Sequence, residues 1–415
     1  MTGELIPTGV TYGVGRNSIN NAFSGTAEFN NIMLGSSANF SGGTGGGILF
    51  SGGTNLYDIF STGSDVDFWI AGTGTDSIVQ FGGGNISSGI TSVAEGYQTV
   101  AGGDYSHAEG YRTTASGSRA HSEGNETRAI GQYSHAENFY SIASGESSHA
   151  EGIASTAFGA GSHSEGSSTS AIGLSSHAEG GGTIASGNTS HSEGSNTSAV
   201  GNTSHSEGSN TSAVGDSSHS EGYITTASGQ RSHAEGSTTT AIGFASHTEG
   251  AGTIAEGQQS HAEGTSSTSI GTGSHAEGQQ TIASGNTSHA EGFLTSAIGF
   301  ASHTEGRNTE AITSYSHAGG LGSIASGQTS FIHSSNSLVT GHRSVVLGGQ
   351  NITGTTNDTV YVPNLNINND LYLINPTIPS FSGDTGYIGQ ISWDSDYMYI
   401  CISTDTWKRS LLTSW

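Results

Sequence analysis

The chain of 415 residues contains 67 glycines and only 31% hydrophobic residues, which is too little apolar material for several conventional globular cores. Its formal net charge of −25 excludes nucleic acid as a partner, because a nucleic-acid-binding surface must be basic to displace counterions. A single cysteine, Cys401, excludes an intrachain disulfide. No signal peptide follows Met1 and no run of about 20 apolar residues is present, so we expect neither signal-directed secretion nor membrane insertion.

Residues 1–77 differ in pattern from the rest of the chain. They carry short apolar runs at 48–50, 56–60 and 68–70, separated by Gly, Ser and Thr residues. Such runs predict short strands, so we expect an N-terminal β domain here. The glycine-rich segment 42–47 is not a phosphate-binding loop, because it lacks the Lys-Ser/Thr ending of that motif and no helix follows it.

Histidine recurs with a strict period through the middle of the chain. Sixteen histidines from His107 to His317 fall on every fourteenth residue, and fifteen of them are followed two places later by a glutamate. A fixed period without insertions is typical of a solenoid, in which each repeat packs only against its neighbours. The fifteen pairs are His107 and Glu109, His121 and Glu123, His135 and Glu137, His149 and Glu151, His163 and Glu165, His177 and Glu179, His191 and Glu193, His205 and Glu207, His219 and Glu221, His233 and Glu235, His247 and Glu249, His261 and Glu263, His275 and Glu277, His289 and Glu291, and His303 and Glu305.

Each repeat divides into two halves of seven residues, and each half predicts a short strand followed by a glycine turn. Strand side chains alternate between faces, so His107 and Glu109 share one face while Ala108 lies on the other. The middle of the second strand is almost always alanine, which predicts a very thin roll. Glycines such as Gly152 and Gly159 recur seven residues apart, and we expect them to supply positive φ or close backbone approach. Two glycines per repeat also exclude a helical coiled coil.

The fourteen-residue frame continues beyond the histidines at both ends, where apolar residues replace them. Counting this slot from residue 79 to residue 345 predicts twenty coils, and a strand spacing of about 4.8 Å predicts a rod roughly 95 Å long. The histidine slot of the end coils holds Val79, Val93, Phe331 and Val345, and the glutamate slot holds Phe81 and Leu347.

Segments 92–96 and 344–348 read Ser-Val-Ala-Glu-Gly and Ser-Val-Val-Leu-Gly. They resemble the repeat of YadA-like heads in trimeric adhesins, a left-handed parallel β-roll in which three chains pack side by side. The resemblance covers residues 78–350 and implies an all-β homotrimeric fibre. That family places two apolar residues where this chain mostly places His and Glu. Because the same face helps to form the trimer interface in the family, the resemblance implies that the His/Glu layers lie between subunits.

A regular His/Glu face allows several kinds of chemistry. A glutamate that accepts a hydrogen bond from a histidine would satisfy both side chains, and the pair can repeat along the coils as a ladder. We expect this pairing to raise the histidine pKa. The alternative is a metal site with three histidines per layer and glutamate behind them. We expect no metal and no cofactor, since a metal site is usually one irregular cluster rather than a feature of every coil. Catalysis is not expected, because Ser162 and His163 are adjacent strand residues and point to opposite faces.

The C-terminal part predicts a change of structure. Residues 351–379 read as a neck or transition, and residues 380–415 contain a hairpin with its turn at 403–406. This segment resembles the foldon of phage fibritin, which implies a trimerisation module. Residues 52–60 resemble stretches near the N-termini of phage tail and fibre proteins, which implies docking to a virion. The hairpin residues expected to promote trimerisation are Tyr397, Tyr399, Ile400, Trp407, Leu411 and Trp415.

Taken with the resemblance, these features predict a structural homotrimeric fibre of a bacteriophage, not an enzyme. We expect it to be made in the host cytoplasm and carried on the virion, where its N-terminal region contacts other virion proteins and the fibre attaches to an unidentified host receptor. A bacterial surface adhesin is the alternative, although the signal peptide, coiled-coil stalk and membrane anchor of such adhesins are not recognisable in this sequence. An ice-binding array is a weaker alternative, because the outward positions vary too much to form flat Thr/Ser rows.

Overall fold

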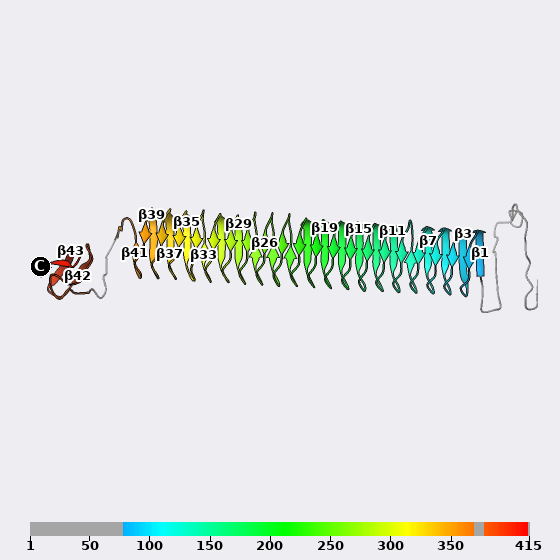
Figure 1. Cartoon of the computed structure of the whole chain (residues 1–415), viewed down its shortest axis with the longest axis horizontal. Helices are drawn as coiled ribbons and strands as arrows, with labels where there is room; N and C mark the ends of the chain where they lie inside the picture. The colour runs from blue at the N-terminus through cyan, green and yellow to red at the C-terminus, as the bar shows by residue number, and fades with distance from the viewer. Residues whose placement is uncertain (1–77, 369–376, 414–415) are drawn as a thin grey trace, which may run out of the picture. The chain divides into compact units, whose positions relative to one another are not determined.

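The computed structural model describes residues 78–368 and 377–413, and all of their regular structure is β (Figure 1). The predicted N-terminal domain at 1–77 lies outside the described residues. The described part of the chain has no helix able to cross a membrane. It comprises a parallel solenoid and a small antiparallel sheet, as the sequence predicted.

The solenoid consists of two parallel sheets whose strands alternate along the chain. The first sheet contains β1 (Ile78–Gly83), β3 (Ser92–Tyr97), β5 (His107–Tyr111), β7 (His121–Asn125), β9 (His135–Ala136), β11 (His149–Ile153), β13 (His163–Ser167), β15 (His177–Gly181), β17 (His191–Ser195), β19 (His205–Ser209), β21 (His219–Tyr223), β23 (His233–Ala234), β25 (His247–Thr248), β27 (His261–Ala262), β29 (His275–Gln279), β31 (His289–Phe293), β33 (His303–Thr304), β35 (His317–Leu321), β37 (Phe331–Ser335), β39 (Val345–Gln350) and β41 (Val360–Tyr361). The second sheet contains β2 (Ile86–Ser87), β4 (Val100–Ala101), β6 (Thr114–Ala115), β8 (Arg128–Ala129), β10 (Ile142–Ala143), β12 (Thr156–Ala157), β14 (Ser170–Ala171), β16 (Ile184–Ala185), β18 (Ser198–Ala199), β20 (Ser212–Ala213), β22 (Thr226–Ala227), β24 (Thr240–Ala241), β26 (Ile254–Ala255), β28 (Thr268–Ser269), β30 (Ile282–Ala283), β32 (Ser296–Ala297), β34 (Glu310–Ala311), β36 (Ile324–Ala325), β38 (Leu338–Val339) and β40 (Thr353–Gly354).

The register of the solenoid follows the sequence period. Pairs such as His149 with His163 are fourteen residues apart, and the second sheet has twenty strands, which confirms the predicted coil count. The last coil is one residue longer: Val345 pairs with Val360 across a register shift in β39. The extra residue falls at Gly348 and Gly349, which both have positive φ. The solenoid therefore continues past residue 350, through β40 and β41.

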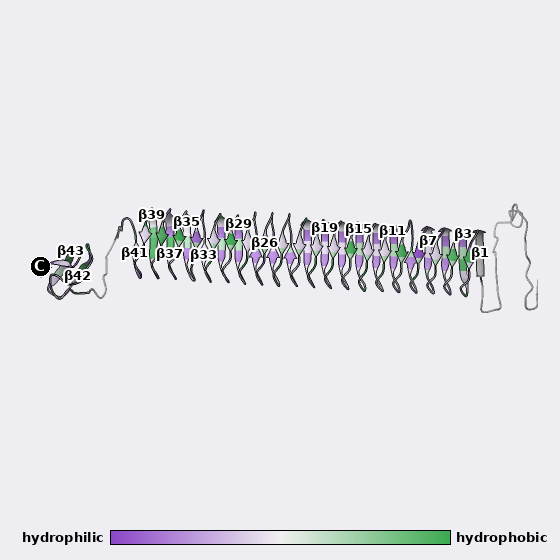
Figure 2. Ribbon diagram, viewed as in Figure 1, coloured by the Kyte–Doolittle hydropathy of each residue, from purple (hydrophilic) through white to green (hydrophobic). Residues whose placement is uncertain are grey.

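The core is a narrow double column of small side chains. Ala108 of the first sheet and Ala115 of the second are both completely buried. Equivalent alanines recur in almost every coil of the second sheet, whereas the first sheet has buried Ala, Ser or Thr at this position in most coils. Buried Ser and Thr side chains flank the alanines and hydrogen-bond within the coil, as between the hydroxyls of Ser192 and Thr197 at 2.7 Å. Larger buried side chains are concentrated in the C-terminal coils, and Figure 2 shows hydrophobic colour over β37 and β39. Close packing of small groups replaces the large apolar core that the composition excludes.

Both glycines of a coil allow close approach to the next coil, since a Cβ at Gly152 would lie 2.1 Å from the carbonyl oxygen of Gly166, but only Gly152 also has positive φ. Gly152 has a φ of +102°, a conformation that side-chain-bearing residues rarely adopt. Gly159 has no such φ, but a Cβ there would lie 1.9 Å from the carbonyl oxygen of Gly173 in the next coil. Both roles were predicted from the seven-residue spacing. Close approach between coils therefore depends on residues that lack a side chain.

The C-terminal module is a three-stranded antiparallel sheet of β42 (Ile391–Trp393), β43 (Tyr397–Ser403) and β44 (Thr406–Leu411), which confirms the predicted hairpin and adds a strand. Tyr399, Cys401 and Trp407 form its small core. Ile400 and Leu411 are exposed on the module's surface, and Trp415 lies outside the described residues.

Candidate functional site

The outward side chains of β5 to β35 form one continuous surface, which we call the His/Glu face: the sixteen histidines and the glutamates two places after them. From His107 to His303 the imidazole rings stack with centroids 4.7–4.9 Å apart and ring planes within 2–10° of parallel. The stack ends at His317, whose ring is turned by 71° relative to His303 and contacts Phe331. In that coil the glutamate slot holds Gly319, so the parallel stack of rings and the row of glutamates end in the same coil.

Glutamates and histidines alternate along the face as a ladder within one chain. Oε2 of Glu109 is 3.8 Å from Nε2 of His107 in its own coil. Oε1 of the same glutamate is 3.8 Å from Nε2 of His121 in the next coil. Fifteen of the sixteen histidines have a glutamate oxygen within 4.0 Å, at 3.2–3.9 Å. Close approaches between histidine and glutamate therefore occur between coils as well as within them.

Most rungs of this ladder are too long to be hydrogen bonds. Nε2 is within hydrogen-bonding distance of a glutamate only at His149, His303 and His317, at 3.2–3.3 Å. The other thirteen Nε2 atoms are covered from solvent and have no hydrogen-bond partner among the described residues. An unsatisfied buried polar atom has a free-energy cost, so the isolated chain leaves this face incompletely satisfied.

The histidine pKa is shifted opposite to the sequence-based expectation. Partial burial lowers the pKa of His121, and the charges of His135 and His107 lower it further, against a smaller opposing effect of Glu123 and Glu109. The same direction and leading cause hold for eight other histidines of the stack: His135, His177, His191, His219, His233, His261, His275 and His317. For these nine histidines the prediction of a raised pKa is wrong, because each imidazole is partly desolvated and also neighbours other imidazoles, and these effects outweigh the glutamates.

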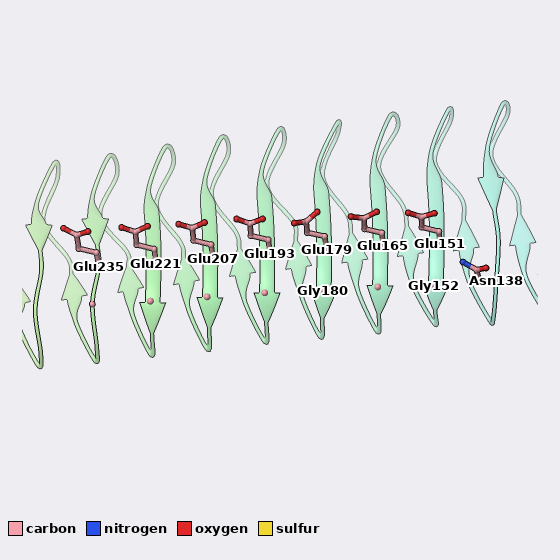
Figure 3. A pocket seen from close by; sticks show the side chains of 15 residues that line it. Asn138, Glu151, Gly152, Glu165, Glu179, Gly180, Glu193, Glu207, Glu221 and Glu235 are labelled. Atoms are coloured by element: carbon pink, nitrogen blue, oxygen red, sulfur yellow. The ribbon is translucent and has the colours of Figure 1, made fainter.

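The glutamates form a row of stacked carboxyl groups along a groove (Figure 3). The groove has a volume of about 970 Å³ in its longest stretch and is lined by Glu151 to Glu235 and the glycine that follows each of them. Side-chain hydrogen bonding with Glu193 and Glu165 raises the pKa of Glu179 to about 7. Hydrogen bonding with Glu249 and Glu277 likewise raises the pKa of Glu263 to about 8. Partial protonation of Glu179 and Glu263 near neutral pH therefore reduces the formal charge of −25.

In the coil of residues 162–165 the serine and the histidine do not lie side by side. Ser162 is 1% exposed, and its hydroxyl donates to the carbonyl oxygen of Gly159 at 2.7 Å. His163 lies on the outer surface of the same strand, as strand alternation predicted.

The register places the apolar end residues in the predicted slots. Val93 pairs with His107, Phe331 with His317, and Val345 with Phe331. In the backbone register Val79 pairs with Val93 and Phe81 with Glu95, while Leu347 pairs with His333. In the histidine slot the face is thus continuous with Val93 at its N-terminal end and with Phe331 and Val345 at its C-terminal end.

A second surface feature was missed in the sequence, although the fourteen-residue spacing contained it. Arg119 lies over the rings of both Tyr105 and Tyr133, each 5.3 Å from its guanidinium carbon. These residues occupy one turn slot in three successive coils, and each has positive φ. Tyr97 and Tyr111 stack at 5.6 Å. Aromatic and basic side chains therefore gather on the N-terminal coils of a mostly acidic rod.

The coil geometry can now be compared with known protein families. The model of the YadA head domain repeat matches residues 136–162, 192–218, 234–260 and 262–288. The solenoid is built of YadA-like head repeats. No curated protein matches the chain. YadA-like head repeats are structural elements rather than an enzymatic type, and they indicate an adhesin-like fibre.

Proposed function

We propose that the protein is a homotrimeric attachment fibre of a bacteriophage, in which three YadA-like solenoids pack through their His/Glu faces. The observation that carries the proposal is the half-exposed state of the His/Glu face in every coil. Fourteen imidazole side chains between His107 and His303 are 34–38% exposed. A neighbouring chain would cover the half-exposed rings, and the apolar end slots would seal the interface.

The C-terminal module supports a multimer independently. Residues of β43 alternate between faces: Tyr399 and Cys401 are buried, whereas Met398, Ile400 and Ile402 are 41–44% exposed. One sheet thus has an apolar side chain at nearly every position of its middle strand, and only one face is covered by its own chain. Association of identical copies through the second face would remove this apolar surface from water.

Attachment to a host is the role that a rigid repetitive rod performs well. Three chains would present every outward feature three times, so weak contacts would combine into strong binding. The phage assignment rests on the fibritin-like hairpin, and the bacterial surface adhesin is the second candidate because YadA-like repeats fit it equally. Virion docking through residues 1–77 belongs to the phage proposal.

Histidine modification tests the proposed interface. With three His/Glu faces packed together, diethylpyrocarbonate should modify His342, which is exposed on a turn, much faster than the stacked histidines. Rapid modification of most stacked histidines in the intact assembly would contradict it. Immunogold labelling then separates the two settings: label on phage particles supports the fibre, and label on uninfected bacterial cells supports the surface adhesin.

A further inference from the structure

Thirteen Nε2 atoms of the His/Glu face have no hydrogen-bond partner among the described residues, and carboxylate oxygens lie close to most of them. Each Nε2 faces the glutamate row, and five histidines lie within 4.0 Å of carboxylate oxygens from two coils, their own and the preceding one: His107, His163, His205, His219 and His275. One nitrogen and two oxygens thus converge in front of these five rings. Imidazole nitrogen and carboxylate oxygen are both ligands of divalent transition metals.

The spacing of these atoms fits coordination better than hydrogen bonding. A hydrogen bond from N–H to oxygen requires about 2.7–3.2 Å between the heavy atoms. Two ligand atoms on one tetrahedral ion, each about 2.1 Å from the metal, lie about 3.4 Å apart. Nε2 of His107 is 3.4 Å from Oε1 of Glu95 and 3.8 Å from Oε2 of Glu109. Small side-chain rotations would close this triangle around an ion.

The stacking also determines which ligands can share an ion. Successive imidazoles are parallel and 4.7–4.9 Å apart, so their in-plane lone pairs point in the same direction rather than toward each other. Two stacked histidines therefore cannot bind one ion in this geometry, although groups of two histidines and one glutamate lie within 4.8 Å of one another. The geometry selects one histidine and two glutamates per ion. Each glutamate then bridges two adjacent sites through its two oxygens.

We propose that the His/Glu face is a linear array of divalent transition-metal sites, each formed by Nε2 of one histidine, an oxygen of the glutamate in its own coil and an oxygen of the glutamate in the preceding coil. Zn²⁺ is the expected ion, with water completing a tetrahedral shell. The array needs only one chain, so it does not depend on the trimer or on phage attachment. Sixteen glutamates from Glu95 to Glu305 can neutralise about eight divalent ions, and repulsion between ions in adjacent coils favours occupancy of alternate coils.

Metal content and Co²⁺ spectroscopy test the array. The full-length protein is produced in medium containing Zn²⁺ or Co²⁺, passed through a desalting column, and analysed by elemental mass spectrometry. We expect about eight ions per chain, by the charge balance given above, and intense visible d–d bands of tetrahedral Co²⁺ with nitrogen and oxygen ligands. A content below one ion per chain in both media, or Co²⁺ with only weak octahedral bands, would overturn the proposal in favour of a metal-free ladder.

Matched variants separate the array from adventitious binding. The triple variant His191→Val, His205→Val and His219→Val puts into three coils the residue that Val93 and Val345 already place in this slot, so it should keep the fold. The variant removes three of the fifteen sites that have one histidine and two glutamates. Its metal content and its Co²⁺ band intensity should therefore both fall by about one-fifth. His342→Ala removes an exposed histidine outside the face and should change neither quantity. Equal metal loss in both variants, or none in the triple variant, would contradict the assignment.

Discussion

A glycine of the second turn gives the sharpest test of how the coils stack. Gly201 follows β18, and a Cβ built on it would lie 2.0 Å from the carbonyl oxygen of Gly215 in the next coil. Ordinary contacts to a Cβ begin near 3.4 Å, so Gly201→Ala forces the two coils apart locally by more than 1 Å. The amides of Val200 and Gly201 both donate to the carbonyl oxygen of Ala213, at 2.8 and 3.3 Å, and both bonds would be strained.

These losses set the expected magnitude. Two backbone hydrogen bonds contribute about 1 kcal/mol each, and overpacking of a tight contact costs about 1–3 kcal/mol more. Gly201→Ala should therefore destabilise its region by about 3–5 kcal/mol. Because each repeat contacts only its nearest neighbours, the destabilisation should be confined to the neighbouring coils, at about residues 187–229.

Hydrogen exchange read by mass spectrometry measures this region by region. Amides near residue 201 should exchange faster in Gly201→Ala, while amides near residue 107 keep their protection. Gly181→Ala is the matched control, because a Cβ at Gly181 meets nothing within 4 Å and its φ is not positive. If the amides near residue 201 exchange no faster in Gly201→Ala than in Gly181→Ala, then the close approach between coils does not exclude a side chain at Gly201, and the coils are not stacked as tightly as described.

The remaining predictions concern the core, the His/Glu face and the C-terminal module. Ala199→Leu places a large side chain in a fully buried column and should lower the unfolding free energy by about 1–3 kcal/mol in chemical denaturation, whereas an unchanged midpoint would mean that the roll is not tightly packed. His205→Val alone should leave the thermal midpoint the same or higher, since valine fills this slot in end coils; a large loss would show that the imidazole itself is required. Deleting residues 380–415 should lower the yield of soluble multimer in size-exclusion chromatography, and an unchanged yield would remove the trimerising role of the hairpin. The hydroxyl of Tyr399 and the amides of Asp396 and Tyr397 donate to Asp394 and hold its pKa below the ordinary 3.8. Because the pKa of Asp394 is lower in the folded state than in the unfolded state, its contribution to stability is complete above pH 3.8 and is lost as the pH falls through the folded pKa. Tyr399→Phe should reduce this loss of stability at acid pH, measured by fluorescence titration. An acid profile identical to that of the unmodified protein would refute the linkage.

The strand pattern and the two faces were predictable because both depend only on alternation along a strand. Ala108 inward and His107 outward follow from their adjacency, and the fixed period extends that assignment to every coil. The direction of the histidine pKa was not predictable from pairs alone. It depends first on the partial burial of each ring and then on the stacking of like groups between coils, which at 4.8 Å lower the pKa of His121 against the glutamates.

Two other features depended on information that lies outside a single repeat. The longer last coil arises from the Gly348-Gly349 pair, and a glycine in a turn slot does not reveal whether a residue has been inserted. The cluster of Arg119 with Tyr105 and Tyr133 becomes visible only when equivalent turn positions of three coils are aligned. The repeat pattern therefore predicts the features that all coils share. Features of particular coils can be predicted only by comparing the variable positions of neighbouring coils.

The central claim is that identical chains associate in threes through the His/Glu face. Static light scattering of the full-length protein, coupled to size-exclusion chromatography, measures the mass of the folded assembly directly. The account predicts a single species with three times the mass of one chain. A folded species with the mass of one chain, stable on dilution and retaining the β-sheet circular dichroism spectrum, would contradict it.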